Sequence, residues 1–146
     1  MKIRKANEGD VKRIHTIYKK GIVDELGTQN LTKEILKYKW PEGEIRKKLS
    51  LKKEFLLVAE ENQVLGFAHA KILDSKRGLI DKIYVDIKFR NKGVAKKLVS
   101  EILRWFKLKK IKDVRANILI KNYSSIKLIQ KFNFKPRYTN WELRLK

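Results

Sequence analysis

The sequence predicts a layered α/β (α+β) domain, with a mixed, mostly antiparallel central sheet of six to seven strands flanked by about four helices. Residues 10–27 and 91–111 place apolar side chains three and four positions apart, which is the spacing of amphipathic helices. Three runs rich in β-branched and aromatic residues, 55–59, 64–70 and 79–85, are separated by short polar turns and indicate an antiparallel meander.

The N-terminal third adds a strand and an interrupted helical region. Residues 1–7 alternate as a strand, and Asp10 precedes the first helix, where a short polar side chain is favoured. From 31 to 53 the helical spacing is interrupted at Trp40-Pro41, because proline disfavours the helical conformation in the residue before it. We therefore expect two helical pieces between the first helix and the meander.

The C-terminal third adds two strands and a short helix. Residues 114–120 return to strand character, Asn122 is a suitable N-cap for a helix that carries Leu128 and Phe132, and residues 138–145 alternate as a final strand. With 146 residues, 42% of them apolar, and no linker or repeat, the chain is expected to form a single domain over 1–146.

Composition limits the chemistry that the chain can perform. The absence of cysteine excludes disulfides, thiolate nucleophiles and cysteine-based zinc sites, and His15 and His69 lack the spacing of metal ligands, so no metal is expected. No stretch approaches the roughly 18 apolar residues of a membrane span, and the first residues lack the apolar run of a signal peptide. We therefore expect a cytoplasmic protein without a membrane partner.

The formal charge is +21, from 37 Lys and Arg against 16 Asp and Glu. Such an excess attracts polyanions, so weak association with nucleic acid or the ribosome is one interpretation. The other is a lysine-rich surface adapted to heat, because the lysines are spread over every segment and lack the aromatic residues that alternate with them in single-strand binding surfaces. Both interpretations stay open, as does the choice between monomer and homodimer.

The junction between the strand 79–85 and the next helix combines small and basic residues. It reads Arg90-Asn91-Lys92-Gly93-Val94-Ala95, followed by Lys96-Lys97. A glycine at a helix start lets backbone N–H groups approach a ligand, and these groups lack acceptors within the helix. The helix dipole and the basic side chains favour an anion at the same place. The junction therefore suggests a pyrophosphate site, although ordinary helix starts share these features.

Two motifs in order resemble those of the GCN5-related N-acetyltransferase (GNAT) superfamily. Ile83-Tyr84-Val85 followed by Arg90-Asn91-Lys92-Gly93-Val94-Ala95 is similar to the acetyl-CoA motif, Arg/Gln-x-x-Gly-x-Gly/Ala. The segment 122–134 is similar to the second motif, Asn-x-x-Ala-x-x-Leu/Phe-Tyr-x-Lys-x-Gly-Phe. The resemblance covers nearly the whole chain. It implies the GNAT acyl-CoA N-acyltransferase fold and direct acetyl transfer from acetyl-CoA to a primary amine of a small metabolite, peptide or protein.

The resemblance also implies a cofactor site. Backbone amides of 91–96 would bind the pyrophosphate, and main-chain groups of Ile83 and Val85 would pair with the pantetheine arm like an added strand. Asn122 would lie beside the arm and Lys131 at the adenosine end. The expected cofactor-binding residues are Ile83, Tyr84, Val85, Arg90, Asn91, Lys92, Gly93, Val94, Ala95, Lys96, Asn122 and Lys131.

Two catalytic residues are expected. Counting in twos puts Asp81 on the strand face of Leu79, Ile83 and Val85, close to the expected slot, so it is a candidate general base, with an ordinary salt-bridged aspartate as the alternative. The family's usual tyrosine acid is replaced by Ile129. Tyr123 is the candidate acid in its place, with Tyr84 and Tyr138 as further possibilities, and a backbone N–H near Val85 would polarise the thioester carbonyl.

Substrate choice is left open by the sequence. Asn117 stands where some peptide N-terminal acetyltransferases carry Glu or His, Ile87 replaces a frequent proline and Asn91 a frequent glycine. Acceptor specificity would depend on residues 27–53. The high positive charge favours an acidic metabolite or a nascent chain over a polycationic amine. A nucleic-acid-binding protein and a non-catalytic CoA sensor on the same fold are the alternatives.

Overall fold

A five-stranded sheet in the order β1-β2-β3-β4-β5 forms the centre of the computed structural model, which describes residues 1–26, 39–143 and 145. The first four strands pair antiparallel with one another, and β5 pairs parallel with β4. The strands are β1 (Lys2–Lys5), β2 (Glu54–Glu61), β3 (Gln63–Ile72), β4 (Arg77–Val85) and β5 (Asp113–Ala116). The mixed, mostly antiparallel sheet confirms the predicted fold class.

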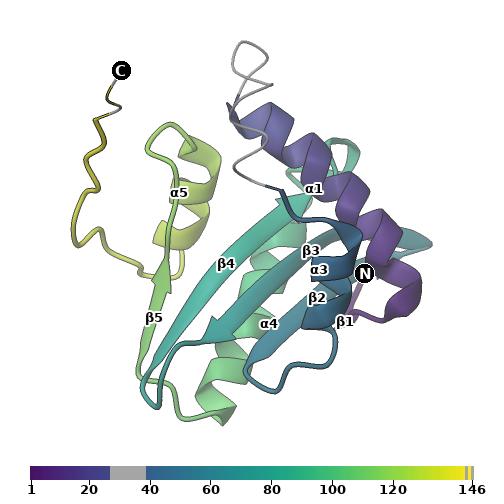
Figure 1. Cartoon of the computed structure of the whole chain (residues 1–146), viewed down its shortest axis with the longest axis horizontal. Coiled ribbons are helices and arrows are strands. Elements are labelled where there is room, and N and C mark those ends of the chain that lie inside the picture. Colours follow the sequence, from purple (N-terminus) through teal and green to yellow (C-terminus); the bar gives the residue numbers. More distant parts are fainter. Residues whose placement is uncertain (27–38, 144, 146) are drawn as a thin grey trace.

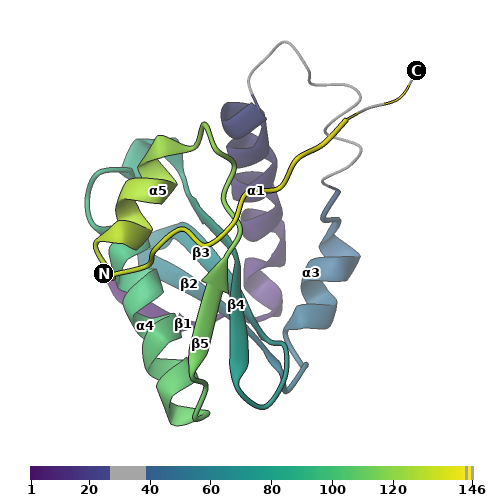
Figure 2. The same ribbon diagram turned by 90° about the vertical axis from the view of Figure 1, so that its left-hand side faces the viewer.

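Helices cover both faces of the sheet (Figures 1 and 2). One face carries α1 and α3, the other carries α4, and α5 follows β5. The helices are η1 (Glu8–Asp10), α1 (Val11–Leu26), α3 (Glu42–Lys48), η4 (Ile87–Phe89), α4 (Val94–Leu108) and α5 (Tyr123–Gln130). None of the helices in the described ranges is long and apolar enough to cross a membrane.

Alternation along the strands gives each face its own core. In β2, Leu57 and Ala59 pack in the core on the α4 side, whereas Leu56 and Val58 pack in the core beneath α1 and α3. The α4 core also contains buried side chains of that helix, namely Val94, Leu98, Val99, Ile102 and Phe106. The α1 core is rich in rings, which belong to Tyr18, Trp40 and Phe67, with Tyr84 packed against them.

A β-bulge in β4 changes the face on which Asp81 lies. His69 of β3 is opposite Lys82, and the next residue, Ala70, is opposite Ile80, so Asp81 is an extra residue. Its carboxylate contacts His69 and Lys82, and the His69 ring lies beside Trp40 in the α1 core. The count in twos that grouped Asp81 with Ile83 and Val85 is therefore wrong, because both of those residues pack against the α4 core.

Two predicted strands differ from the structure, which has five strands in its described part rather than six to seven. β5 ends at Ala116, not at residue 120, and residues 138–143 have no regular secondary structure. Tyr138 and Trp141 are 73% and 89% exposed. Strand preference reflects how well a segment fits a partner surface, so alternation alone does not make a strand where no partner lies alongside.

The interrupted helical region is confirmed in its second half. Pro41 is the N-cap of α3, and its fixed φ of −67° suits that position. Trp40 is buried and stacks on Phe67, with 5.6 Å between ring centroids. The helical piece expected before Trp40 falls largely on residues 27–38, which lie outside the described residues.

Candidate functional site

The candidate site begins where β4 continues beyond β5. Pairing between the two strands runs from Arg77 to Ile80 on β4. In the described ranges, the rest of β4, residues 81–85, continues without a strand on that side (Figure 1). Asp86 donates its N–H to the carbonyl of Leu65 on β3 at 2.8 Å. Because N–H groups alternate in direction along a strand, those of Ile83 and Val85 point away from β3, toward this open edge. The edge can pair with an extended, amide-bearing chain.

The loop after β4 leads into the uncapped start of α4. Asn91 and Gly93 both have left-handed backbone conformations, with φ of 61° and 79°. Asparagine tolerates this conformation better than most residues, which accounts for Asn91 at a position that is often glycine in the family's motif. No side chain among the described residues caps α4, and its first N–H to find a helical acceptor is that of Lys97, which donates to the Gly93 carbonyl at 3.1 Å.

Three backbone donors therefore gather at the start of α4. The N–H groups of Val94, Ala95 and Lys96 have no acceptor within the helix, and the helix dipole adds positive potential there. A Cβ atom built on Gly93 would meet nothing within 4 Å, so the approach to these donors is open. The arrangement can bind an anion such as pyrophosphate directly beside the open edge of β4.

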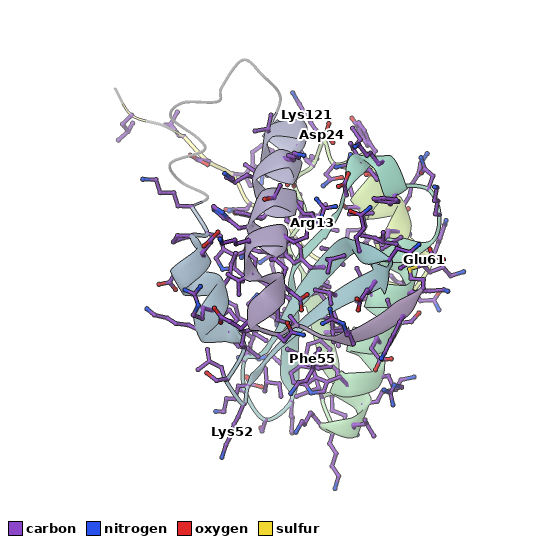
Figure 3. All side chains as sticks on the ribbon, turned by 90° about the vertical axis from the view of Figure 1, so that its right-hand side faces the viewer. Arg13, Asp24, Lys52, Phe55, Glu61 and Lys121 are labelled. Carbon is purple, nitrogen blue, oxygen red and sulfur yellow. The ribbon has the colours of Figure 1, made fainter. Side chains whose placement is uncertain are left out.

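The basic residues of the site take different positions. Arg90 donates from Nε to the Val85 carbonyl at 3.1 Å. It also forms an ion pair with Asp24, which lies in the last turn of α1 and is labelled in Figure 3. It therefore braces the loop against α1. Lys92 lies over the Phe89 ring, with Nζ 5.6 Å from the centroid, and Lys96 is exposed. Lys131 is exposed at the C-cap of α5.

Asn122 has two roles at the start of α5. Its side-chain oxygen accepts from the Ser125 N–H at 3.2 Å, which confirms the predicted N-cap. Its side-chain nitrogen donates to Oε1 of Glu25 at 3.2 Å. The cap orients the amide, so its nitrogen faces α1.

Glu25 connects three elements around the site. Its Oε2 accepts from the Tyr84 hydroxyl at 2.9 Å, while Oε1 accepts from Asn122, so one carboxylate of α1 joins β4 to α5. Burial raises the pKa of Tyr84 well above its ordinary value, and the charge of Glu25 and the hydrogen bond to it act in the same direction. The Tyr84 hydroxyl therefore stays protonated and acts as a donor to Glu25.

Sequence reasoning missed Glu25, although the helix carries a signal for it. Asp24 and Glu25 occupy the last turn of α1, which contains no basic residue. The helix dipole favours cations at that end, so two carboxylates there oppose a local rule in a chain with abundant lysine. Departures of this kind are expected at functional sites.

Gly21 lies one turn before Glu25 and makes room for Tyr84. A Cβ atom on Gly21 would lie 2.2 Å from Cδ1 of the Tyr84 ring. The ring also stacks on Phe67 and meets Tyr18 edge-on, with centroid distances of 5.7 and 5.2 Å. The close approach of ring and helix brings the Tyr84 hydroxyl to Glu25, because positions i and i+4 share one helix face.

We expect Gly21→Ala to lower the free energy of unfolding by about 1–2 kcal/mol, as the tightly packed Tyr84 ring must move. Helix propensity alone would predict the opposite, a gain of up to about 1 kcal/mol. Urea unfolding measures the difference. Gly43→Ala in α3 is the matched control, since a Cβ there meets nothing within 4 Å, and it should leave stability unchanged or slightly higher. A Gly21 variant as stable as this control would contradict the packing account.

Asp81 belongs to a separate, buried polar cluster. Its Oδ2 lies 3.0 Å from Nδ1 of His69 and 2.6 Å from Nζ of Lys82. His69 is fully buried, and its Nε2 lies 3.5 Å from Oε1 of Glu54, which also pairs with Lys48. Burial, the largest single influence, raises the pKa of Asp81, but the hydrogen bonds from His69 and Lys82 and the charges of Lys82 and Lys71 outweigh it. The net pKa lies far below the usual range.

This pKa has a consequence for stability. Because the folded-state pKa of Asp81 lies below the unfolded value of about 3.9, the stabilisation is present above about pH 4 and is lost as the pH falls toward the folded-state pKa. We expect acidification from pH 7 to pH 3 to destabilise the wild-type protein more than Asp81→Asn, as measured by urea unfolding. Equal losses in both proteins would remove Asp81 from the acid response.

The remaining predicted residues lie apart from these contacts. Tyr123 is 69% exposed at the first position of α5, and Tyr138 is 73% exposed. Ile129, at the position of the family's usual tyrosine, is partly buried, and Asn117 is exposed just after β5. The first part of the region expected to set substrate choice, 27–38 of 27–53, lies outside the described residues.

Comparison with known proteins identifies the family. The model of the acetyltransferase (GNAT) family matches residues 25–134. An N-acetyltransferase from Staphylococcus aureus Mu50 is 32% identical, with a TM-score of 0.74 over 92% of this chain and 82% of that one. The chain belongs to the GNAT acetyltransferase family. No curated protein matches the sequence.

Other GNAT structures share the fold at lower identity. The PaiA N-acetyltransferase of Thermoplasma acidophilum in complex with coenzyme A has a TM-score of 0.86 at 18% identity, covering 95% of this chain and 92% of that one. An aminoglycoside acetyltransferase from an uncultured soil metagenomic sample, in complex with sisomicin, has a TM-score of 0.73 at 16% identity over 99% and 96%. In this GNAT protein, the open edge of β4 and the start of α4 are the elements on which a cofactor site can form.

Proposed function

We propose that this GNAT protein is an acetyl-CoA-dependent N-acetyltransferase that transfers an acetyl group directly to a primary amine. The observation that carries the proposal is the sequence of features along one segment, as far as the chain is described: an edge over 81–85 that pairs with no strand, a left-handed loop, and a helix start at Val94 without a side-chain cap. A strand edge fits the amide-bearing pantetheine arm, and free helix donors fit a pyrophosphate. Acetyl-CoA contains both, joined in that order.

The cofactor contacts follow from this segment. The main chain of Ile83 and Val85 would pair with the arm, and the N–H groups of Val94, Ala95 and Lys96 would hold the pyrophosphate. The loop residues Asn91, Lys92 and Gly93 set the shape of this anion site, while Arg90 fixes the loop to α1. We further propose that Asn122 and the Tyr84 ring flank the thioester end, and that Lys131 serves the adenosine end.

The reaction needs a neutral amine, a polarised thioester carbonyl, an acceptor for the amine proton and a proton donor for the departing thiolate. The amine nitrogen bonds to the acetyl carbon as the carbon–sulfur bond breaks, and the Val85 N–H would stabilise the carbonyl oxygen. The amine proton passes to a carboxylate, for which Asp81 and Glu25 are the candidates. The departing thiolate takes a proton from Tyr123 or from solvent.

The test is an assay of thiol release from acetyl-CoA with a panel of primary amines, amino acids and peptides, together with calorimetric titration of CoA. We expect saturable binding of CoA and release of thiol that requires an amine. CoA binding without thiol release for any amine would favour a non-catalytic CoA sensor. Tight, salt-dependent binding of DNA or RNA with no affinity for CoA would favour the nucleic-acid-binding alternative.

A further inference from the structure

Glu25 differs from the other acidic residues around the site in the partners it has. Asp24 pairs with Arg90, Asp81 with Lys82, and Asp86 with Arg13. The hydrogen bonds to Glu25 in the described part of the chain come from two neutral donors, the Tyr84 hydroxyl and the Asn122 amide. They orient its carboxylate, and no cationic side chain of the described residues forms an ion pair with it, in a protein whose formal charge is +21.

The position of Glu25 makes this charge available to a ligand. Its side chain is only partly buried, and the two donors come from β4 and from the N-cap of α5, the elements beside which the proposed acetyl-CoA arm would lie. A carboxylate offers about four acceptor positions, and the two donors occupy two. Acceptor capacity therefore remains on a carboxylate held next to the proposed acyl site.

Three features that cost stability by themselves are found around Glu25, and they support a functional role for its carboxylate. Glu25 opposes the dipole at the end of α1, and Gly21 lies in the interior of the same helix, where glycine costs up to about 1 kcal/mol relative to alanine. The third is the burial of the Tyr84 hydroxyl, which requires a partner and finds Glu25. Gly21 admits the Tyr84 ring, and the Tyr84 hydroxyl then holds the Glu25 carboxylate.

We propose that Glu25 binds the ammonium group of the acceptor and then takes its proton, and that the acceptor is a cationic amine without a neighbouring carboxylate. The inference rests on the proposed acetyltransferase function. In the step, one ammonium N–H proton moves to a Glu25 oxygen, and the freed nitrogen lone pair forms the bond to the acetyl carbon as the carbon–sulfur bond breaks. The second proton that the nitrogen loses passes through solvent to the departing thiolate, which leaves as the thiol. Tyr84 and Asn122 are positioning residues that hold the carboxylate.

This assignment separates the two candidate carboxylates. Asp81 is already paired with Lys82 and His69, so a proton would have to compete with these partners. Glu25 gains a cation when the acceptor binds. The assignment also reverses the expectation that the positive net charge favours an acidic acceptor, because an acidic metabolite would place its own carboxylate beside that of Glu25.

The experiment compares amines that differ in one charge. Thiol release is measured with alkylamines of three to six carbons and with the ω-amino acids of equal length, for example butylamine against 4-aminobutyrate. We expect the wild-type kcat/KM to be at least about tenfold higher for the alkylamine. Glu25→Gln should lower kcat/KM at pH 7 by about 100-fold or more, within the range of general-base effects, and should remove the preference. Near pH 10, where the amine deprotonates unaided, the loss should shrink markedly.

Controls separate this inference from the proposed function. Glu101→Gln makes the same change on α4, where Glu101 pairs with Arg104, and should match wild type. In Asp81→Asn, kcat/KM should still fall at acidic pH, because the general base that is protonated there is proposed to be Glu25. Glu25→Asp should restore part of the activity lost in Glu25→Gln, because it keeps the carboxylate. The affinity of Glu25→Gln for CoA should stay within about twofold of wild type, because Glu25 is proposed to contact the acceptor and not the cofactor. If the wild-type protein itself fails to bind CoA, the proposed function is contradicted, and not the role of Glu25.

Several outcomes would overturn the assignment. They are an ω-amino acid acetylated as well as its alkylamine, a Glu25→Gln variant with wild-type kcat/KM at pH 7, and CoA binding without acetylation of any alkylamine. If Glu25→Gln does not fold, NMR of the wild-type protein decides. Butylamine, but not 4-aminobutyrate, should then shift the side-chain amide signals of Asn122, and unchanged signals would count against the inference.

Discussion

Replacing Gly93 with glutamate is expected to weaken acetyl-CoA binding by about 100-fold or more while the protein stays folded. Gly93 has φ of 79°, and a side chain there would extend into open space beside the start of α4. A carboxylate at this point repels the pyrophosphate and competes for the N–H donors of the first turn. Losing two hydrogen bonds to a charged group, at roughly 1.5–3 kcal/mol each, gives a change of this size. Calorimetric titration measures it.

Gly93→Asn is the matched control for the charge. Asparagine adopts the left-handed conformation readily, as Asn91 does two residues earlier, and it adds no charge. This variant should bind acetyl-CoA within about tenfold of wild type, since most of the effect of glutamate is electrostatic. Equal losses in the two variants would indicate that loop shape, rather than an anion site, controls binding. An unchanged affinity in Gly93→Glu would refute the anion site.

His69→Leu is expected to lower the free energy of unfolding by about 2–4 kcal/mol at pH 7. His69 is fully buried between Asp81 and Glu54, and the substitution leaves two carboxylates without the imidazole that separates them. Removing one partner of a buried polar cluster costs about 3–5 kcal/mol, and the lysine partners of both carboxylates reduce this cost here. Urea unfolding gives the value.

The other histidine provides the control for this variant. His15 lies on α1 with 25% of its side chain exposed, 3.9 Å from a carboxylate oxygen of Glu42. His15→Leu should change the unfolding free energy by no more than about 0.5 kcal/mol, as is usual for a surface substitution. If His69→Leu were as stable as His15→Leu, the buried cluster would have no role in holding Asp81, and the acid sensitivity expected from Asp81 would need another source.

Much of the fold could be predicted because its signals are local. The apolar spacing of α1 and α4 and the three runs of the meander each depend on neighbouring residues. The bulge at Asp81 could not be predicted, because it depends on how β3 and β4 pair, and one extra residue reverses the faces that follow. The strand predicted over 138–145 was wrong for its described part, 138–143, for a related reason, since strand formation needs a partner edge.

The site divides in the same way. The start of α4 at Gly93 carries its signal in the sequence, because a small residue and an anion-binding helix start lie next to each other. Glu25 reaches Tyr84 and Asn122, which are 59 and 97 positions away, so no local pattern pairs them. The resemblance placed Tyr84 and Asn122 at the cofactor site but left Glu25 out. The local signal for Glu25 is the departure from local preference at Gly21 and Glu25, which indicates a position, not a partner.

The most direct test of the central claim is an NMR titration of the 15N-labelled protein with CoA. The claim is that the open edge of β4 and the uncapped start of α4 together bind the cofactor. We predict saturable shifts of the amide signals of Ile83, Val85, Val94, Ala95 and Lys96, with slower hydrogen exchange at Ile83 and Val85 in the complex. Saturable binding that leaves these five amides unchanged, or no binding at all, would contradict the claim.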